Sequence, residues 1–169
     1  MYMQRSRKIV FVAHPVLNQN STPQGKGYAP GPIKEVMEIL GEAGVGIVQL
    51  PCIETEHFGL DRKPKMKEDL DNKSYRAACK KMAQEIIKNI INYKEKKYSV
   101  VGILGLEFSP TYAVHQLENG HRNTPGKGIL MEEIEMEMNK KRMQIPLIGV
   151  SANNPTSSAQ KLKQLMQFS

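Results

Sequence analysis

The sequence predicts a doubly wound α/β protein, because four apolar, β-rich segments alternate with segments of helical periodicity. The apolar segments are residues 8–13, 45–50, 99–106 and 146–150. Continuous rather than alternating apolarity is typical of strands that are covered on both faces of a parallel sheet. Parallel neighbours require right-handed crossover connections, so we expect a Rossmann-like three-layer sandwich. Its four-stranded parallel sheet should have the order 2-1-3-4, with strands numbered along the chain.

The segments between and after the strands carry apolar residues at helical spacing, which predicts four helices. Glycine and proline residues, such as Pro32, Gly41 and Gly44, punctuate the first of them. The apolar positions are Ile33, Val36, Met37 and Leu40 in the first helix; Tyr75, Cys79, Met82, Ile86 and Ile90 in the second; residues 129–143 in the third; and Ala159, Leu162 and Met166 in the last.

Length and composition favour a single α/β domain over residues 1–169. The chain has 169 residues, of which 40% are apolar, enough to build one core of ordinary size. It contains no run of about eighteen apolar residues, so we expect a cytoplasmic protein without a membrane partner.

The net charge of +7, from 24 Lys and Arg against 17 Asp and Glu, invites a nucleic-acid interpretation. The cations fall in short mixed runs at predicted helix ends and loops, where solvated positive charges complement the helix dipole. No Lys and Arg stripe is interleaved with aromatic residues, as binding of a single strand would require. We therefore expect a small-molecule ligand and no nucleic-acid partner.

In a doubly wound sheet, ligands bind beyond the carboxyl ends of the strands, where the strand order reverses. The chain segments expected there are residues 14–20, 52–56 and 107–121. The long polar stretch 51–74 is a candidate lid over them. The polar side chains of His14, Asn18, Asn20 and Tyr112 lie in these segments and are the candidate ligand-binding residues.

Two cysteines are too few for a four-cysteine metal site. Cys79 lies on the apolar stripe of the second helix and is expected in the core. Cys52 follows a strand at the predicted functional edge and is the candidate metal or cofactor ligand. Together with His14, His115 and His121 it offers donors for a mononuclear zinc or iron site.

Glycine residues flank Lys127 just before the third predicted helix. The spacing is not that of a phosphate loop, which needs four residues between its glycines and a Ser or Thr after the lysine. The segment 126–128 is then either an anion-binding helix entry, through free backbone N–H groups, or a simple turn.

Four segments of the chain resemble, in order, the motif blocks of the 2-thiouracil desulfidase family. They are residues 13–20 (AHPVLNQN), 50–54 (LPCIE), 109–112 (SPTY) and 125–129 (PGKGI). In that family three cysteines hold a 4Fe–4S cluster, whose open iron takes sulfur from a thiolated pyrimidine. The resemblance implies that Cys52 is a cluster ligand, Glu54 the catalytic glutamate and Ser109 the catalytic serine. Pro15 and Tyr112 stand where the family has its other two cysteines.

Two hypotheses follow from this departure. In the first, the protein is a desulfidase-like enzyme that cleaves a C–S bond at a site containing Cys52, Glu54 and Ser109, with either an unusually ligated cluster or a different metal. His14 and His115 are the candidate nitrogen ligands. In the second, it is a cluster-free relative that binds a nucleobase or nucleotide. A third interpretation makes Glu54 or Glu107 a nucleophile at an N-glycosidic bond.

Overall fold

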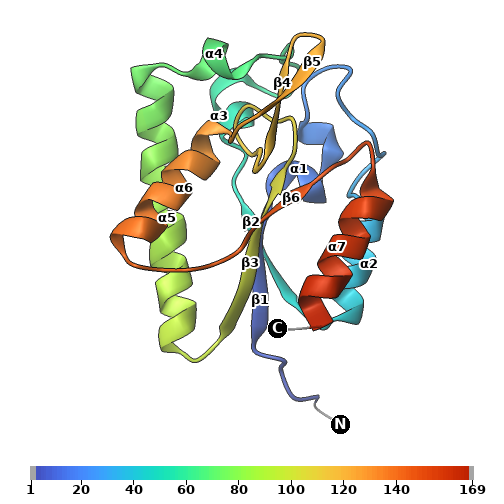
Figure 1. The fold of residues 1–169 in the computed structure, drawn as a ribbon, viewed down its shortest axis with the longest axis vertical. Coiled ribbons are helices and arrows are strands. Elements are labelled where there is room, and N and C mark those ends of the chain that lie inside the picture. Colours follow the sequence, from blue (N-terminus) through green and yellow to red (C-terminus); the bar gives the residue numbers. More distant parts are fainter. Residues whose placement is uncertain (1–2, 168–169) are drawn as a thin grey trace.

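The computed structural model describes residues 3–167, which form a parallel four-stranded sheet with helices on both faces (Figure 1). The order β2-β1-β3-β6 confirms the predicted 2-1-3-4 arrangement. The boundaries of the two central strands agree with the sequence prediction, and the other two strands begin one residue later than predicted. The strands of the sheet are β1 (Lys8–Ala13), β2 (Gly46–Leu50), β3 (Ser99–Leu106) and β6 (Leu147–Val150).

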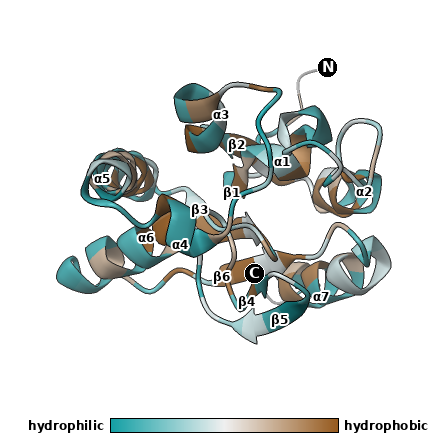
Figure 2. Ribbon diagram, turned by 90° about the horizontal axis from the view of Figure 1, so that it is seen from above, coloured by the Kyte–Doolittle hydropathy of each residue, from teal (hydrophilic) through white to brown (hydrophobic). Residues whose placement is uncertain are grey.

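The helices form two layers around this sheet. Figure 2, viewed from the carboxyl ends of the strands, shows α5 and α6 on one face and α2 and α7 on the other. All four helices were predicted from their apolar spacing, and the structure confirms them. The helices are α1 (His14–Leu17), the 3₁₀ turn η1 (Gln19–Ser21), α2 (Lys34–Glu42), α3 (Ile53–Phe58), α4 (Lys67–Leu70), α5 (Lys73–Glu95), α6 (Ile129–Lys140) and α7 (Pro155–Gln167).

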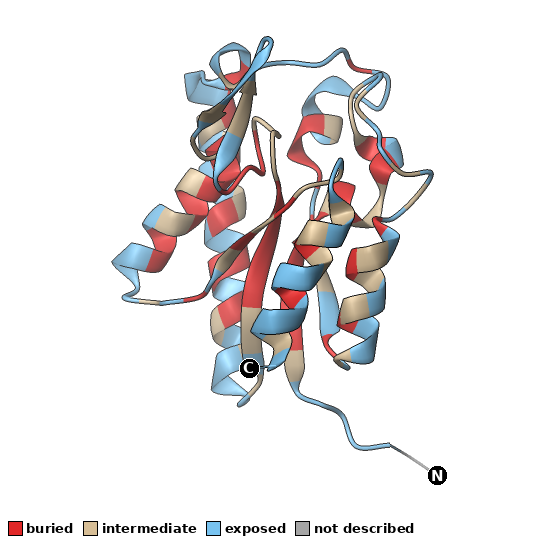
Figure 3. Cartoon of the chain, turned by 45° about the vertical axis from the view of Figure 1, so that its right-hand side comes forward, coloured by how far each residue is buried: buried red, intermediate tan, exposed pale blue. Residues whose placement is uncertain are grey.

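The core lies between the sheet and these helices, and the central strands supply its middle layer (Figure 3). Val10 and Val12 face one helix layer, while Phe11 packs edge-on against Tyr93 of α5 on the other, with ring centroids 6.2 Å apart. Cys79 is fully buried in this core, as the sequence predicted. Burial of each large apolar side chain contributes about 1.5–3 kcal/mol, so the central strands contribute much of the stability of the sheet.

The expectation that every strand is covered on both faces is wrong for β2. Residues 46, 47 and 49 are exposed, and Ile47 keeps 41% of its surface accessible. β2 has a strand neighbour on one side only, and the helix layers centre on the inner strands. An edge strand needs less coverage by helices than a central strand. The apolar residues of β2 therefore reflect strand propensity more than burial.

An antiparallel hairpin, which the sequence did not predict, lies between β3 and α6. Its strands are β4 (Gln116–Asn119) and β5 (Arg122–Pro125), joined through Gly120 at φ 62°. The segment is too polar for its sequence to indicate two strands. Its pairing is fixed by the rest of the fold. The polar stretch 51–74 likewise contains α3 and α4, which pass over the carboxyl end of the sheet. Within residues 3–167, no helix is both long and apolar enough to cross a membrane.

Candidate functional site

A pocket of about 150 Å³ lies beyond the carboxyl ends of β1, β2 and β3, at the edge where the sequence predicted the site. Its walls come from the segments that follow these strands and β6, from the loop before α2 and from the β4–β5 hairpin. The side chains that form its floor and walls include Pro15, Gln19, Cys52, Glu54, Arg62, Leu106, Glu107, Ser109, Pro110 and Tyr112; those at its mouth include Thr22, Pro23, Lys26, Tyr28, Pro64, Lys65, Glu118, Asn123 and Asn153.

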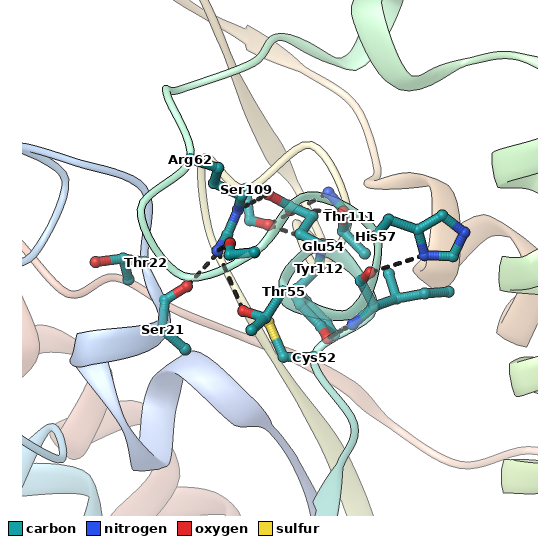
Figure 4. A network of polar contacts seen from close by, with 12 residues as sticks. Ser21, Thr22, Cys52, Glu54, Thr55, His57, Arg62, Ser109, Thr111 and Tyr112 are labelled. Atoms are coloured by element: carbon teal, nitrogen blue, oxygen red, sulfur yellow. Dashed lines mark hydrogen bonds and ion pairs between the residues drawn. The ribbon is translucent and has the colours of Figure 1, made fainter.

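Glu54 is the acidic group at the centre of the polar network of this pocket (Figure 4). It lies in the first turn of α3, and only 5% of the residue is exposed. Its Oε2 accepts a hydrogen bond from Nε of Arg62 at 3.2 Å, and its Oε1 accepts one from the hydroxyl of Thr111 at 2.6 Å. A buried carboxylate requires such partners, because removing it from water is otherwise costly.

Arg62 joins three chain segments at the pocket. Besides Glu54, it donates to the carbonyl oxygen of Ser21 at 2.7 Å, to the hydroxyl of Thr55 at 3.1 Å and to the carbonyl oxygen of Gly59 at 3.2 Å. The planar guanidinium offers five donors in a fixed geometry, which suits it to this branching role. Arg62 therefore fixes α3 and the following loop against the segment after β1.

A directed chain of hydrogen bonds supports Glu54 from the opposite side. The hydroxyl of Thr111 has one hydrogen, which it gives to Glu54, so its oxygen accepts the hydrogen of the Tyr75 hydroxyl 2.8 Å away. Tyr75 belongs to α5 and is buried, and that burial raises the pKa of its hydroxyl. The neutral phenol of Tyr75 thus remains a donor to Thr111 over the physiological pH range. The Glu54 carboxylate accepts from Thr111 and from Arg62.

Ser109 presents the opposite hydrogen-bonding character. Its hydroxyl oxygen accepts the backbone N–H groups of Thr111 at 3.2 Å and Tyr112 at 3.1 Å, which makes it the cap of the turn after β3. Its hydroxyl hydrogen is donated to no group in the described part of the chain. Ser109 lines the pocket, so this hydrogen can be offered to a bound molecule.

The three positions that the resemblance assigned to cluster ligands, Pro15, Cys52 and Tyr112, all line this one pocket. Their chemistry does not fit a 4Fe–4S cluster. Proline has no side-chain donor atom, and the Tyr112 hydroxyl donates to the carbonyl oxygen of Pro51 and accepts the backbone N–H of Ile53 at 3.4 Å. Burial raises the pKa of Tyr112 well above its ordinary value, so the phenol keeps its proton. Only Cys52 offers a thiolate, where a cluster needs several.

The predicted ligand residues of the first segment bond to one another instead of lining the pocket. Nδ2 of Asn18 lies 3.2 Å from Nε2 of His14, and Oδ1 of Asn18 accepts the backbone N–H of Asn20 at 3.2 Å. None of the three belongs to the lining within residues 3–167. Partial burial lowers the pKa of His14, which favours the neutral ring. These residues shape the turn after β1.

Within residues 3–167, no three His, Cys, Asp or Glu side chains come close enough together to hold a metal ion. The mononuclear zinc or iron interpretation therefore has no donor cluster to support it there. Glu107 has a structural role that engages its carboxylate: it accepts the backbone N–H groups of Val114, His115 and Gln116 and contacts Nδ1 of His115 at 2.8 Å. This carboxylate anchors the base of the β4–β5 hairpin.

The segment 126–128 is a helix entry in which the N–H groups of both glycines have carbonyl partners. The N–H of Gly126 donates to the carbonyl of His115, and that of Gly128 to the carbonyl of Ala113, both at 2.9 Å. Gly128 also passes so close to the Thr111 backbone that a Cβ atom would overlap it. These two hydrogen bonds favour the turn interpretation, and Gly128 packs α6 against the pocket segment.

Sequence reasoning missed Arg62, Thr111 and Tyr75. Arg62 adjoins a lysine-rich segment typical of a solvated loop, and Tyr75 lies on the apolar stripe of the second predicted helix. Thr111 stands inside the third motif block, between the candidate residues Ser109 and Tyr112, and this position is the one signal that the sequence offers. No local pattern distinguishes a buried polar residue from an exposed one, since burial depends on the packing of distant segments.

Together, the fold and the site define a Rossmann-like α/β protein with a polar pocket at the reversal of its strand order. The chain is similar to "Uncharacterized protein MJ0003" of Methanocaldococcus jannaschii, with 38% identity over 149 residues that cover 88% of this chain and 89% of that protein. The chain therefore belongs to the same family as MJ0003. No family model and no solved structure matches the sequence significantly.

Proposed function

We propose that the protein binds a small, planar, polar molecule of the nucleobase type in this pocket, as a cluster-free relative of the desulfidases. One observation carries the proposal: Glu54 and Ser109 line the same pocket with opposite hydrogen-bonding character. The carboxylate is an acceptor, and the hydroxyl has a hydrogen to donate. Nucleobase edges carry neighbouring donors and acceptors and are complementary to such a pair.

The hydrogen-bonding capacity of Glu54 supports this complementarity. Each carboxylate oxygen can accept about two hydrogen bonds, and Arg62 and Thr111 use one on each oxygen. The remaining lone pairs are available to an N–H group of a ligand. Glu54 is fixed by Arg62 and Thr111, and Ser109 by two N–H groups of its own turn, so little conformational entropy is lost when a ligand binds.

The apolar walls and the size of the pocket support a ring-shaped ligand. Pro15, Leu106, Pro110 and the ring of Tyr112 contribute apolar surface around the polar pair. The volume is about 150 Å³, and a cavity of this size admits a benzene-sized ring. We therefore favour a single-ring heterocycle over a purine, with any ribose or phosphate group at the mouth.

The test is a thermal-shift screen of uracil, 2-thiouracil, cytosine, adenine and uridine monophosphate. A base at ten times its Kd stabilises the native state by about 1.4 kcal/mol, which raises the Tm of a protein of this size by about 3–6 °C. Glu54→Gln and Ser109→Ala should lose this shift. Glu38→Gln, on the exposed side of α2, should keep it and serves as the matched control.

Two results would contradict the proposal. One is the absence of any shift with all five compounds. The other is the broad visible absorption of an iron–sulfur cluster after anaerobic reconstitution with iron and sulfide, lost in Cys52→Ser, together with sulfide release from 2-thiouracil. The second result would restore the desulfidase hypothesis.

A further inference from the structure

Two loops distant in sequence meet across the mouth of the pocket. Nζ of Lys26, in the loop between η1 and α2, lies 2.7 and 2.8 Å from the two carboxylate oxygens of Glu118 on β4. Both side chains line the pocket, and Figure 1 shows the loop and the hairpin at the same end of the molecule. The pair is separated by 92 residues, so it joins the two sides of the mouth.

Each of these loops is anchored behind the pair. The hairpin is held at its base by the carboxylate of Glu107, which accepts three backbone N–H groups. The other loop is held by Gln24, whose backbone N–H donates to the carbonyl of Arg62 at 3.1 Å and whose side chain donates to that of Asp61 at 3.0 Å. Among residues 3–167, the Lys26–Glu118 pair is the one hydrogen-bonded or ionic link between residues 22–28 and the hairpin.

We propose that the Lys26–Glu118 ion pair is a clasp that closes the mouth of the pocket and opens to admit its ligand. The two side chains keep 37% and 39% of their surface exposed, so water and salt weaken their attraction. Opening therefore costs little, while the anchored bases return the loops to the closed arrangement. The identity of the ligand that the clasp admits rests on the proposed function, but the test of the clasp requires no ligand.

The protein contains its own reporter of opening and its own reference. Cys52 lines the pocket with 7% of its surface exposed, whereas Cys79 is fully buried in the core, and the chain has no other cysteine. An opened mouth exposes the first thiol and leaves the second protected. The experiment measures alkylation of each thiol by N-ethylmaleimide, an uncharged reagent, with peptide mass spectrometry to assign the site.

We expect Lys26→Met and Glu118→Gln each to raise the Cys52 alkylation rate about two- to five-fold, which is the factor that the loss of an exposed ion pair gives. The Cys79 rate should stay unchanged. The charge-reversed double variant, Lys26→Glu with Glu118→Lys, should return the rate towards that of the natural protein. Lys34→Met is the matched control, since it removes an exposed ion pair with Glu38 on α2, away from the pocket.

Unchanged Cys52 rates in both clasp variants would overturn the clasp, as would equal increases in Lys34→Met. Parallel increases at Cys52 and Cys79 would also overturn it, because they would report general loosening of the fold. The base screen separates this outcome from a failure of the proposed function. Base binding without a labelling response contradicts the clasp alone, and a labelling response without base binding contradicts the nucleobase proposal alone.

Discussion

The carboxylate of Glu54 and the guanidinium of Arg62 form a buried ion pair, with 3.2 Å between Oε2 and Nε. Both residues come from the polar stretch after β2, and the pair links α3 to the segment after β1 through the Ser21 carbonyl. Its value to the protein is the fixed position of an acidic group in the wall of the pocket. The same pair makes the site sensitive to single substitutions.

Arg62→Met should be strongly destabilising, because it leaves the Glu54 carboxylate buried without its cationic partner. Removal of one member of a buried ion pair typically costs about 3–5 kcal/mol. Urea unfolding followed by circular dichroism measures the change in the free energy of unfolding. Lys34→Met, at an exposed pair, should cost less than about 1 kcal/mol. Equal effects of the two substitutions would show that Glu54 is not held as the structure describes.

Thr111→Val should uncouple Tyr75 from Glu54 without a large change in side-chain volume. It leaves the Tyr75 hydroxyl without its acceptor and Oε1 of Glu54 without its donor, at a cost of about 1–3 kcal/mol for each buried group. Thr111→Ser keeps the hydroxyl and should retain most of the stability and of any base-dependent thermal shift. If the valine and serine variants behave alike, the hydroxyl has no such role.

The stability of the protein should fall above pH 9, in part through Cys79. Burial raises the pKa of this thiol from its ordinary value of 9.0 to about 12. The folded state therefore holds a proton that the unfolded chain loses, and the stability present below pH 9 is lost as the pH rises towards 12. Between pH 8 and pH 10 this loss amounts to about 1.4 kcal/mol.

Cys79→Ala provides the comparison for this pH dependence. Its free energy of unfolding, measured in urea at pH 8 and pH 10, should fall by about 1.4 kcal/mol less than that of the natural protein. The cavity left by the sulfur lowers stability equally at both pH values, so the difference isolates the titration. Parallel pH curves for the two proteins would contradict the assignment.

Gly105→Ala should destabilise the fold at the point where β3 meets the pocket segment. An added Cβ would overlap the carbonyl oxygen of Tyr112, which accepts the backbone N–H of Leu106 at 3.1 Å. Overpacking against backbone is expected to cost about 3 kcal/mol. Gly41→Ala is the matched control in α2: apart from the backbone of its own helix and its chain neighbours, no atom lies within 4 Å of the added Cβ, and the substitution should stabilise the helix by about 0.5–1 kcal/mol. Thermal unfolding should move in opposite directions for the two variants.

The sequence by itself determined the doubly wound fold, the strand order and the edge at which the pocket lies. These follow from properties that a linear chain displays: continuous apolar runs such as that of β1, helical spacing such as that of α5, and the preference for right-handed crossovers. Glu54, Ser109 and Cys52 are expected at this edge because each lies within a few residues of the end of a strand. All three line the pocket.

Only the tertiary structure decided which polar side chains are buried together. Arg62 and Thr111 reach Glu54 from segments 8 and 57 residues away, while Asn18 and His14, equally plausible in sequence, bond to each other outside the pocket. Tyr112 and Pro15 stand in the pocket wall, but neither replaces a thiolate. The phenol of Tyr112 is bonded to the Pro51 carbonyl, and proline has no side-chain donor atom. Such partnerships depend on the distances and directions that packing sets between remote segments, and no local periodicity encodes them.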